Sequence, residues 1–577
     1  MAAMWSRSDM KILLATLHAK YSHASLALPC LAACCRDLPG VTVTLREYTV
    51  NEPREHLLRL VMSEQAELVA FSCYIWNIEK TLKIASDIKK INPETRILLG
   101  GPEVSFGVFE LMHNHPAVDF VIKGEGEAVF RQLAEALSSQ GAEKPSASAF
   151  EDIDNLFFRD KNDISAGPQS RGYLHLDSIP SPFEAGLVDL NKPLTYYETS
   201  RGCPFSCAFC LSSVEGQVRS FSMERIRRDL LFLMQQKVLQ IKLVDRTFNY
   251  DARRADDIWR FILEHNQSSR FHFEIAADLL NDASLEILKQ VPADTFRFEI
   301  GVQSASGDTL KQVNRTADLG RIFYVVRRLR AETKIELHLD LVAGLPGENY
   351  AAFLASLQAV ADLHPHQIQV EPLKVLKGSP MREIAAREDY HFSAAPPYTI
   401  LRNHWLSYDD IGRIETIGRL LDLFYNHGGF GTALELLTRI KPLSILLDRM
   451  SANASGKALS GLSSQRLYEL FFCLAATGDG NSSDSLLADA LFFDFCCSEL
   501  PRQGKLPLFI AERSLTCAWP GGRELTAGMD MLPGSRVKAF RFSFSRDYRI
   551  RPWGENPAEI TFVYASSTGS GLKIIYL

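Results

Sequence analysis

The sequence predicts an α/β protein in which two runs of alternating strands and helices are followed by a mixed α+β region. The first run lies within residues 11–140 and contains five apolar, strand-like segments, each followed by an amphipathic helical segment. The second run begins near residue 191, and a loop with three cysteines follows its first strand. Alternation of this kind favours parallel sheets. We therefore expect a doubly wound parallel sheet, then a partial (βα) barrel, then a third region.

Length and composition are consistent with this organisation. The 577 residues suffice for about three domains, which we place at 1–140, 191–381 and 382–577, with a linker at 141–190. The net charge of −6 argues against a general nucleic-acid-binding surface. No apolar run is long enough to span a membrane, and the first ten residues lack the hydrophobic core of a signal peptide. We expect a cytoplasmic protein without membrane association.

The first run resolves into five βα units. Strands are predicted at 11–17, 41–48, 68–72, 96–100 and 118–123, and helices at 25–36, 55–65, 78–91, 105–114 and 127–137. In a doubly wound sheet, ligands bind beyond the carboxyl ends of the strands. Polar or glycine-rich loops follow those ends, with candidate ligand-binding residues His18, Ser72, Tyr74, Gly100, Gly101, Gly124 and Glu125. Glycine there would let the backbone approach a bulky ligand closely.

Periodicity disappears between residues 141 and 190. Ser, Asp and Pro dominate this stretch, as at Pro180 and Pro182. Because proline fixes an extended path, we expect a linker between domains.

The second run predicts six strands, at 194–199, 239–244, 271–276, 295–300, 335–341 and 367–372, with helices between them. Six such units make a partial barrel, whose functional residues belong at the carboxyl ends of the strands. Polar residues and a glycine turn recur there: Asp245, Thr247, Asn249, Glu299, Gln303, His338, Asp340 and Gly344. A solvated strand end is the alternative for each residue alone, but their recurrence in step with the strands favours a site.

The cysteine loop predicts a soft-metal site. Cys203, Cys207 and Cys210 are separated by three and two residues, and Gly202 and Pro204 disfavour regular structure, so the thiols can converge. Sulfur ligands select iron–sulfur clusters, zinc or cuprous copper. Three ligands leave one position open in a tetrahedral zinc site or a four-iron cluster. A structural zinc loop with a distant fourth ligand, or three unrelated buried thiols, are the alternatives, but no His or Cys follows within fifty residues.

This CxxxCxxC loop, with Phe209 just before the third cysteine, resembles the signature of the radical S-adenosylmethionine (SAM) superfamily. In that family three cysteines hold a four-iron four-sulfur cluster whose open iron binds the amino and carboxylate groups of SAM. The resemblance implies that the three cysteines are cluster ligands, and that an electron donor such as flavodoxin or ferredoxin reduces the cluster. It further implies roles in SAM binding: Asp245, Thr247 and Asn249 at the amino group, Glu299 and Gln303 at the ribose and carboxylate, and the turn at Gly344 at the adenine, with His338 and Asp340 on the preceding strand.

The first domain resembles the Rossmann-like cobalamin-binding domain of cobalamin-dependent radical SAM enzymes. The resemblance rests on the five βα units and on the Gly-Gly-Pro and Gly-Glu-Gly-Glu turns. Other cobalamin-binding families carry a DxHxxG loop after the first strand; here that register keeps His18 but lacks the aspartate and the glycine. Without its partner, His18 is a poor candidate ligand, although many radical SAM relatives bind cobalamin without a histidine. A sheet retained for folding or substrate contact is the alternative.

The two resemblances together imply a radical SAM enzyme with a TIM-type partial barrel that cleaves SAM to a 5′-deoxyadenosyl radical. With cobalamin as methyl carrier, the expected activity is methyl transfer to an unactivated carbon. A rearrangement or cyclisation without methyl transfer, and a non-catalytic cobalamin or redox sensor, are the alternatives. The sequence does not select a substrate.

The C-terminal region carries no catalytic motif. Helices are predicted at 411–425, 433–449 and 464–475, and a strand at 536–544. The arrangement is similar to uncharacterised proteins in which a cobalamin-binding domain and a radical SAM core precede a C-terminal domain of unknown role.

Overall fold

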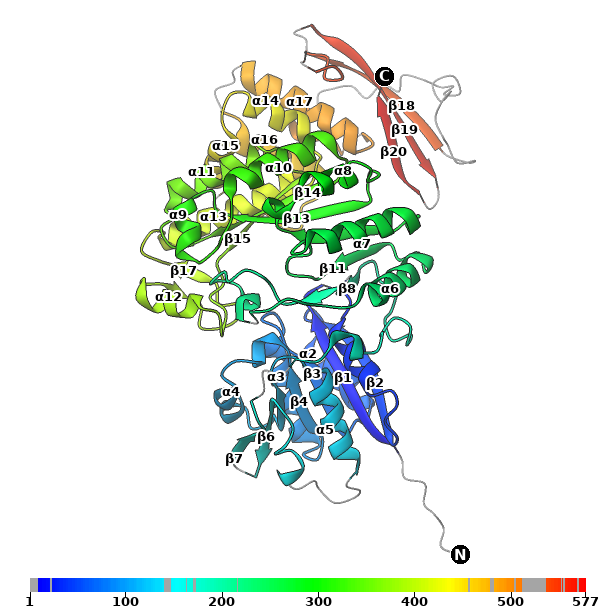
Figure 1. The fold of residues 1–577 in the computed structure, drawn as a ribbon. Helices are drawn as coiled ribbons and strands as arrows, with labels where there is room; N and C mark the ends of the chain where they lie inside the picture. The colour runs from blue at the N-terminus through cyan, green and yellow to red at the C-terminus, as the bar shows by residue number, and fades with distance from the viewer. Residues whose placement is uncertain are drawn as a thin grey trace, which may run out of the picture. The chain divides into compact units, whose positions relative to one another are not determined.

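The computed structural model describes residues 9–20, 23–139, 147–161, 163–169, 173–214, 216–454, 457–477, 482–502, 505–510, 536–551, 553, 556–567 and 570–576 (Figure 1). The chain forms two compact units. The first comprises Met1–Gly301, Gly307–Leu337 and Leu373–His404, and the second comprises Val302–Ser306, His338–Pro372 and Trp405–Leu577. Among the described residues, no helix has the length and apolar character needed to cross a membrane.

A seven-stranded sheet in the first unit confirms the predicted doubly wound fold. Its strand order is β2-β1-β3-β4-β5-β6-β7, and the first five strands run parallel. The strands are β1 (Met10–His18), β2 (Val41–Thr49), β3 (Leu68–Ser72), β4 (Arg96–Gly100) and β5 (Phe120–Ile122). The helices are α1 (Ala27–Cys34), α2 (Arg54–Ser63), α3 (Ile78–Ile91), α4 (Val108–Asn114) and α5 (Glu127–Ser139). Each strand lies within two residues of its predicted range.

Both faces of this sheet are buried, which explains its nearly continuous apolar strands. Alternate residues of β1 enter different cores: Leu14 packs with Phe130 of α5, whereas Leu13 packs with Ile84 of α3. Helices therefore cover both faces, and the loops at the carboxyl ends of the strands are held on a rigid framework.

The stretch 141–190, expected to be a linker, contributes two strands to this sheet. β6 (Leu156–Asp160) pairs antiparallel with β5, and β7 (Asp163–Ala166) pairs antiparallel with β6. Leu156 and Phe158 are fully buried in the same core as Phe130. This apolar segment is only a few residues long and lies within polar sequence, so its periodicity was too short to detect. Residues 141–146, 162 and 170–172 of the expected linker lie outside the described residues.

Four parallel strands of the predicted barrel lie side by side, and they belong to the first unit as far as Gly301. They are β8 (Thr195–Tyr197), β11 (Gln240–Leu243), β12 (Arg270–Ile275) and β13 (Phe296–Gln303), in the order β13-β12-β11-β8. The helices α6 (Met223–Gln235), α7 (Ala252–His265), α8 (Asp282–Leu288), α9 (Gly307–Gln312) and α10 (Leu319–Glu332) accompany them. Phe298 of β13 packs against Trp259 of α7. Because side chains alternate along a strand, Glu299 then points to the opposite face of the sheet.

The second unit contains the parallel pair β14 (Glu336–Ala343) and β15 (Gln367–Pro372), joined by α11 (Tyr350–Ala361). The C-terminal region is helical and then strand-rich, as expected. Its elements are α13 (Tyr408–Leu420), a π-helical turn (Leu421–Tyr425), α14 (Gly431–Thr438), α15 (Leu443–Asn453), α16 (Ser464–Ala475), α17 (Ser482–Ser498) and the antiparallel strands β18 (Arg536–Phe544), β19 (Ala558–Ser567) and β20 (Ser570–Tyr576). The single helix predicted at 433–449 is wrong. Pro442 precedes α15 and ends the preceding turn, because proline has no N–H to donate.

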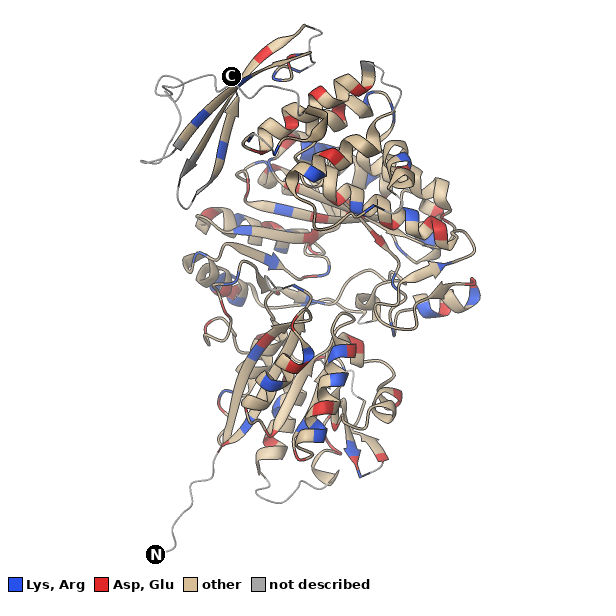
Figure 2. Cartoon of the chain, turned by 180° about the vertical axis from the view of Figure 1, so that it is seen from behind, with Lys and Arg blue, Asp and Glu red and all other residues tan. Residues whose placement is uncertain are grey.

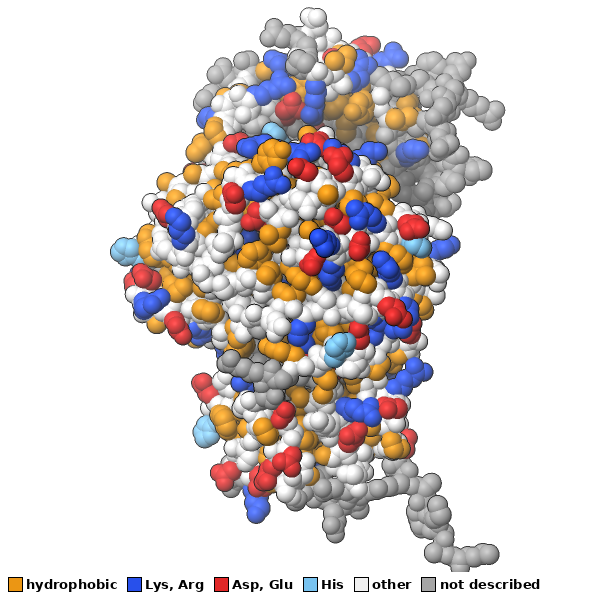
Figure 3. All heavy atoms as spheres, in the orientation of Figure 1, with side chains coloured by type: hydrophobic (Ala, Val, Ile, Leu, Met, Phe, Trp, Pro, Cys, Tyr) orange, Lys and Arg blue, Asp and Glu red, His pale blue; other side chains and the backbone are white. Residues whose placement is uncertain are grey.

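Charged side chains are mixed over the surface. Lys and Arg lie among Asp and Glu along the elements seen from behind in Figure 2, and also on the face shown in Figure 3. On these views the described residues show no continuous basic stripe of the kind that tracks a nucleic-acid backbone.

Asp494 of α17 caps the start of α14, and this contact makes stability depend on pH. Its two carboxylate oxygens accept the N–H groups of Thr432 and Ala433 at 3.0 and 2.9 Å. Burial raises the pKa of Asp494 to about 7, whereas an aspartate in an unfolded chain titrates near about 3.9. Between these values the folded state binds the proton more tightly, so the contribution of Asp494 to stability falls as the pH rises from about 4 to about 7.

We therefore expect Asp494→Asn to remove part of the pH dependence of unfolding. In urea titrations at pH 5 and pH 7.5, the loss of stability on going to the higher pH should be smaller for the variant than for the wild type. Asp409→Asn, at an exposed position in the first turn of α13, should leave the difference unchanged. Parallel pH profiles for wild type and Asp494→Asn would contradict the assignment.

Candidate cofactor site

The three cysteines lie on one loop of the first unit, between β9 (Ser200–Arg201) and a 3-10 turn (Leu211–Val214). Cys207 is buried, and Cys203 and Cys210 are half-buried. A hydrogen bond from Ala208 N–H to Val313 O, at 2.8 Å, fixes the middle of the loop. Gly202 has φ +89°, and a Cβ there would lie 2.1 Å from Gln217 O. Only glycine fits this position, so the tight entry to the loop is built into the sequence.

The donor set of this loop fits an iron–sulfur cluster. Among the described residues, no three His, Cys, Asp or Glu side chains form a group that could hold a single metal ion. A four-iron cluster makes a different demand, since each cysteine ligates a different iron. Three thiols within eight residues of one loop meet that demand.

Arg315 contacts the cysteine loop and was not predicted from the sequence. Its Nη1 donates to Cys207 Sγ at 3.6 Å, and its Nη2 donates to Gly301 O. Burial raises the pKa of the Cys207 thiol, and the Arg315 guanidinium opposes that rise. A cation beside sulfur favours the thiolate, which is the form that binds metal. No sequence signal identifies Arg315, because 108 residues separate it from Cys207.

Asp245 holds the segment that leads into the cysteine loop. Its carboxylate accepts Thr199 N–H at 3.1 Å and the hydroxyl groups of Thr199 and Ser200, and Arg254 lies 3.6 Å away. Asp245 is fully buried, and in this structure its carboxylate anchors the segment Thr199–Ser200. The expected contact of this side chain with a SAM amino group stays a prediction.

The two other polar residues expected after β11 differ from one another. Asn249 also has a structural role, because its side chain donates to Ala276 O at 2.8 Å and accepts Ala276 N–H at 2.9 Å. Thr247 Oγ1 lies 3.5 Å from Cys203 Sγ. Of the three predicted residues, Thr247 is the one whose side chain contacts a cysteine of the loop.

We expect Asp245→Asn to destabilise the apoprotein by about 2–4 kcal/mol, because an amide replaces a charged acceptor of several buried hydrogen bonds. The measurement is urea unfolding of the metal-free chain. Asp257→Asn, half-exposed on α7 with an ion-pair distance of 3.5 Å to Arg260, serves as the matched control and should cost less than about 1 kcal/mol. Equal losses in the two variants would show that Asp245 is not a structural anchor.

A charged cluster lies on the inward faces of β11, β12 and β13. Lys242 Nζ is 3.0 Å from Glu299 and 3.4 Å from Glu274, and His272 Nε2 is 2.9 Å from Glu299. Burial alone would raise the pKa of Glu299, but its hydrogen bonds with His272 and Lys242 lower that pKa below its usual value. Burial raises the pKa of Glu274. Glu299 was predicted, but the other three members of the cluster, Lys242, His272 and Glu274, were not. The cluster gives the interior of the barrel fixed charges of both signs.

The remaining predicted SAM residues lie in the second unit. Gln303 has φ +70° and Gly344 has φ +98°, conformations that allow sharp turns after β13 and β14. His338 Nε2 lies 3.2 Å from Asp340 Oδ1, so these two predicted residues contact each other.

Two predicted cobalamin residues contact charged side chains. His18 is buried, and its Nε2 lies 3.1 Å from Glu47 Oε2, which also accepts a hydrogen bond from Lys192. Glu125 is paired with both Arg219 and Arg201. Glu125 therefore links the loop after β5 to the strands beside the cysteine loop, and its expected role in binding cobalamin stays a prediction.

The other loops at the carboxyl ends of the first sheet offer surface for a bulky ligand. Beside the buried Ser72, the rings of Tyr74 and Trp76 are stacked at 4.3 Å, and Trp76 is 45% exposed. A Cβ on Gly100 or on Gly124 would meet no atom within 4 Å. An exposed aromatic face and two open backbone positions fit a large, flat ligand such as a corrin ring.

The backbone of Gly101 is fixed by its neighbours. Its φ is +105°, and a Cβ there would lie 2.7 Å from Cys73 O. Gly101 therefore lets β4 turn closely over the end of β3, which keeps the surface at Gly100 open.

Comparison with known families matches three regions of the chain. Residues 12–134 match a family described as B12 binding domain, residues 197–360 match the Radical SAM superfamily, and residues 388–518 match a protein family of unknown function, DUF4080.

Curated relatives include the cobalamin-dependent radical SAM methyltransferase TokK of Streptomyces tokunonensis. It is 26% identical over 58% of this chain and 50% of its own. The 2-(S-pantetheinyl)-carbapenam-3-carboxylate methyltransferase of Streptantibioticus cattleyicolor is 26% identical over 60% of this chain and 54% of its own. The chain thus spans about half the length of the curated relatives it matches.

Solved structures share the fold. The radical SAM methyltransferase TsrM from Kitasatospora setae, with cobalamin and a [4Fe-4S] cluster bound, aligns with a TM-score of 0.54 at 16% identity over 68% of this chain and 78% of its own. The cobalamin-dependent SAM radical enzyme OxsB, with aqua-cobalamin and SAM bound, aligns with a TM-score of 0.57 at 15% identity over 84% of this chain and 78% of its own. These alignments confirm the predicted fold class.

Proposed function

We propose, from the premise that this chain is a radical SAM protein with an N-terminal B12-binding domain and a DUF4080 region, that it is a cobalamin-dependent methyltransferase acting on an unactivated carbon. The observation that carries the proposal is that one compact unit contains both the three-cysteine loop and the open glycine and aromatic turns of the first sheet. The names of the curated relatives support the same reaction class.

The proposal assigns residues to three bound groups: the iron–sulfur cluster, SAM and cobalamin. Cys203, Cys207 and Cys210 would hold a four-iron four-sulfur cluster. Thr247 and Glu299 of the first unit are candidates for SAM, and Tyr74, Gly100 and Gly124 are the candidates for cobalamin. Gln303, His338 and Gly344 belong to the second unit, and their predicted roles in SAM binding stay predictions. Bound there, the cluster and SAM supply a carbon-centred radical, and cobalamin supplies the methyl group.

The side chains of the protein position these groups and shield them. Arg315 places a positive charge beside Cys207, which favours the thiolate needed for binding iron. Asp245 fixes the strand that precedes the loop. The stacked Tyr74 and Trp76 provide a flat apolar face, which would exclude water from one side of a bound ring. An electron donor such as flavodoxin or ferredoxin would have to reduce the cluster.

The test is anaerobic reconstitution of the full chain with iron, sulfide and added hydroxocobalamin, followed by gel filtration and absorption spectroscopy. The proposal expects an iron–sulfur shoulder and a corrinoid spectrum in the same protein peak. A corrinoid spectrum without iron would contradict the proposed radical chemistry, which needs the iron–sulfur cluster. Iron without corrinoid would contradict methyl transfer by way of cobalamin and would leave a cobalamin-independent rearrangement or cyclisation.

A further inference from the structure

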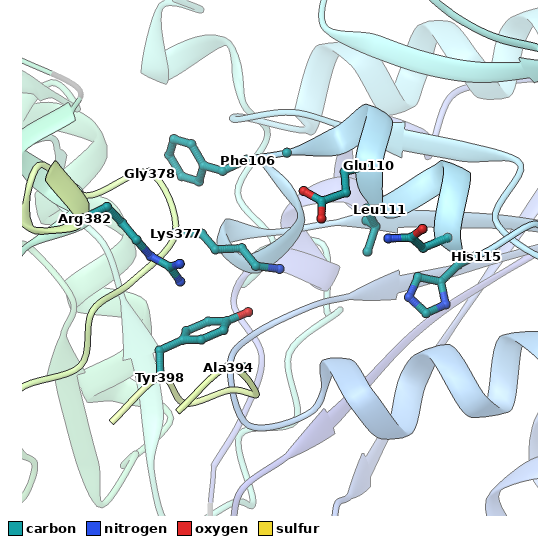
Figure 4. A pocket seen from close by; sticks show the side chains of 11 residues that line it. Phe106, Glu110, Leu111, His115, Lys377, Gly378, Arg382, Ala394 and Tyr398 are labelled. Atoms are coloured by element: carbon teal, nitrogen blue, oxygen red, sulfur yellow. The ribbon is translucent and has the colours of Figure 1, made fainter. Parts of the chain in front are cut away.

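A pocket of about 480 Å³ lies in the first unit, and none of its lining residues belongs to the cysteine loop or to the glycine turns. It is formed by α4 with the residues just before it, and by the segment Leu373–His404, which we call the strap. Figure 4 shows Arg382, Lys377 and Tyr398 of the strap approaching from one side, with Glu110, Leu111 and His115 on the other. The volume is within the range typical of small-molecule sites.

The strap is fixed to the first sheet through Glu103, in the turn after β4. Tyr398 Oη donates to Glu103 Oε1, and Lys377 Nζ lies 3.0 Å from the same oxygen. Glu103 is only 5% exposed. Gly378 packs directly on the Phe106 ring, because a Cβ there would lie 2.2 Å from that ring. The pocket walls are therefore held in place, and the charge of Lys377 is already balanced.

Arg382, the second residue of α12 (Met381–Arg387), is different, because its charge is not balanced. Its guanidinium carbon lies 4.9 Å from the ring centroids of both Tyr398 and Phe392. Its Nε and Nη2 are buried and have no hydrogen-bond partner. Among the described residues, no carboxylate forms an ion pair with this side chain.

An unpaired guanidinium beside a cavity indicates a missing anion. Burying a charge without a partner is costly, so native proteins normally pair it. The two rings hold the guanidinium in a fixed orientation, which lowers the entropy lost when it pairs with an anion. A carboxylate oxygen accepts a charge-assisted hydrogen bond from such a donor. The apolar side chains of Phe106 and Leu111 in the same pocket would suit an apolar group next to the carboxylate.

We propose that this pocket binds a small carboxylate-bearing molecule, with the carboxylate on Arg382 and the apolar part against Phe106 and Leu111. The proposal goes beyond the methyl transfer proposed above, because none of the lining residues belongs to the cysteine loop or to the candidate cobalamin surface. Met381, next to Arg382, contacts that loop through its N–H, which donates to Ala208 O at 2.9 Å. Glu110, exposed at the opposite wall, would repel a bound anion, so Glu110→Gln should strengthen binding.

The test is isothermal titration of the full metal-free chain with benzoate, and with benzamide as its neutral isostere. We expect benzoate to bind with a dissociation constant below about 1 mM, a weak but specific affinity, and benzamide to bind at least about tenfold more weakly. Arg382→Gln should weaken benzoate binding at least about tenfold, the loss expected for one charge-assisted pair. Arg387→Gln, exposed on the same helix, should bind like the wild type.

Each other outcome overturns the proposal. Equal binding of benzamide, or retention of benzoate binding by Arg382→Gln, would show that binding does not depend on the pairing of a carboxylate with Arg382. Absence of benzoate binding would show that the pocket does not accept a carboxylate, and tighter binding of phenyl phosphate would assign it to phosphate esters instead. Circular dichroism and thermal unfolding of Arg382→Gln would establish that the variant is folded, and they do not depend on the bound ligand or on any enzymatic activity.

Discussion

Replacing Cys207 by alanine should abolish both iron binding in the cluster form and the cleavage of SAM. Cys207 is the buried member of the cysteine loop, and its sulfur accepts the hydrogen bond from Arg315. Without it, two thiols remain, too few to hold a four-iron cluster while leaving only one iron open. After anaerobic reconstitution, we expect no iron–sulfur absorbance and no 5′-deoxyadenosine above the background of a protein-free sample.

Cys473→Ser provides the matched control for this experiment. Cys473 is exposed in the second unit, where Lys457 Nζ lies 3.4 Å from its sulfur. This variant should retain the iron content and the SAM cleavage of the wild type. If Cys207→Ala also retained both, the three cysteines would not be the cluster ligands, and the site would have to be sought elsewhere.

Replacing Arg201 by glutamine should destabilise the protein by about 3–5 kcal/mol, the usual cost of removing one partner from a buried ion pair. Arg201 lies two residues before Cys203 and contacts Glu127 at 2.6 Å, Glu198 at 2.9 Å and Glu125 at 3.5 Å. The Glu127 side chain is only 7% exposed. The variant would leave three carboxylates close together, with Arg219 as the remaining cation at Glu125.

The loss in Arg201→Gln should be larger at pH 8 than at pH 5. Burial already raises the pKa of Glu198 to about 7 despite the nearby Arg201, and removing the cation would raise it further. At pH 5 these carboxyls can take up protons in the folded variant, which relieves their repulsion. Urea unfolding at the two pH values measures the difference.

Arg228→Gln is the control for Arg201→Gln, because Arg228 is half-exposed and pairs with the single carboxylate of Glu184 at 3.0 Å. It should cost less than about 1 kcal/mol at either pH. A similar small cost for Arg201→Gln would mean that the ion pairs of Arg201 do not hold the cysteine loop to the first sheet.

The parallel strands were predictable because their apolar runs are bounded by turns. β3 and β4, for example, are five-residue buried segments that end at polar or glycine-rich loops, and their observed bounds equal the predicted ones. The strands β6 and β7 were missed for two reasons. β6 has only three buried apolar residues, Leu156–Phe158, within a polar stretch that was expected to be a linker. The edge strand β7 has no buried residue, so it gives no apolar alternation to detect.

The site was predictable only as far as sequence position determines side-chain direction. The spacing of three cysteines in an irregular loop gave their common location. In contrast, the position of Asp245 after a strand did not reveal that its carboxylate turns back to Thr199 and Ser200. Arg315 could not be found, because its contact with Cys207 depends on how two distant segments pack.

The Lys242–Glu299 contact and the unpaired Arg382 also could not be predicted from sequence position. Lys242 and Glu299 are 57 residues apart in the sequence, and only their positions on neighbouring inward faces bring them together. Arg382 carries no motif at all, and what distinguishes it is that it has no ion-pair partner in the described part of the chain. Such features arise from tertiary packing rather than from local pattern.

The most direct test of the account is the fate of SAM in the anaerobic, reconstituted full chain with dithionite as reductant. We predict 5′-deoxyadenosine and methionine whenever the cluster is present, and S-adenosylhomocysteine in addition only when cobalamin is supplied, because SAM then also serves as the methyl donor. Mass spectrometry measures all three products. The absence of 5′-deoxyadenosine from a protein that carries the intact cluster would contradict the account.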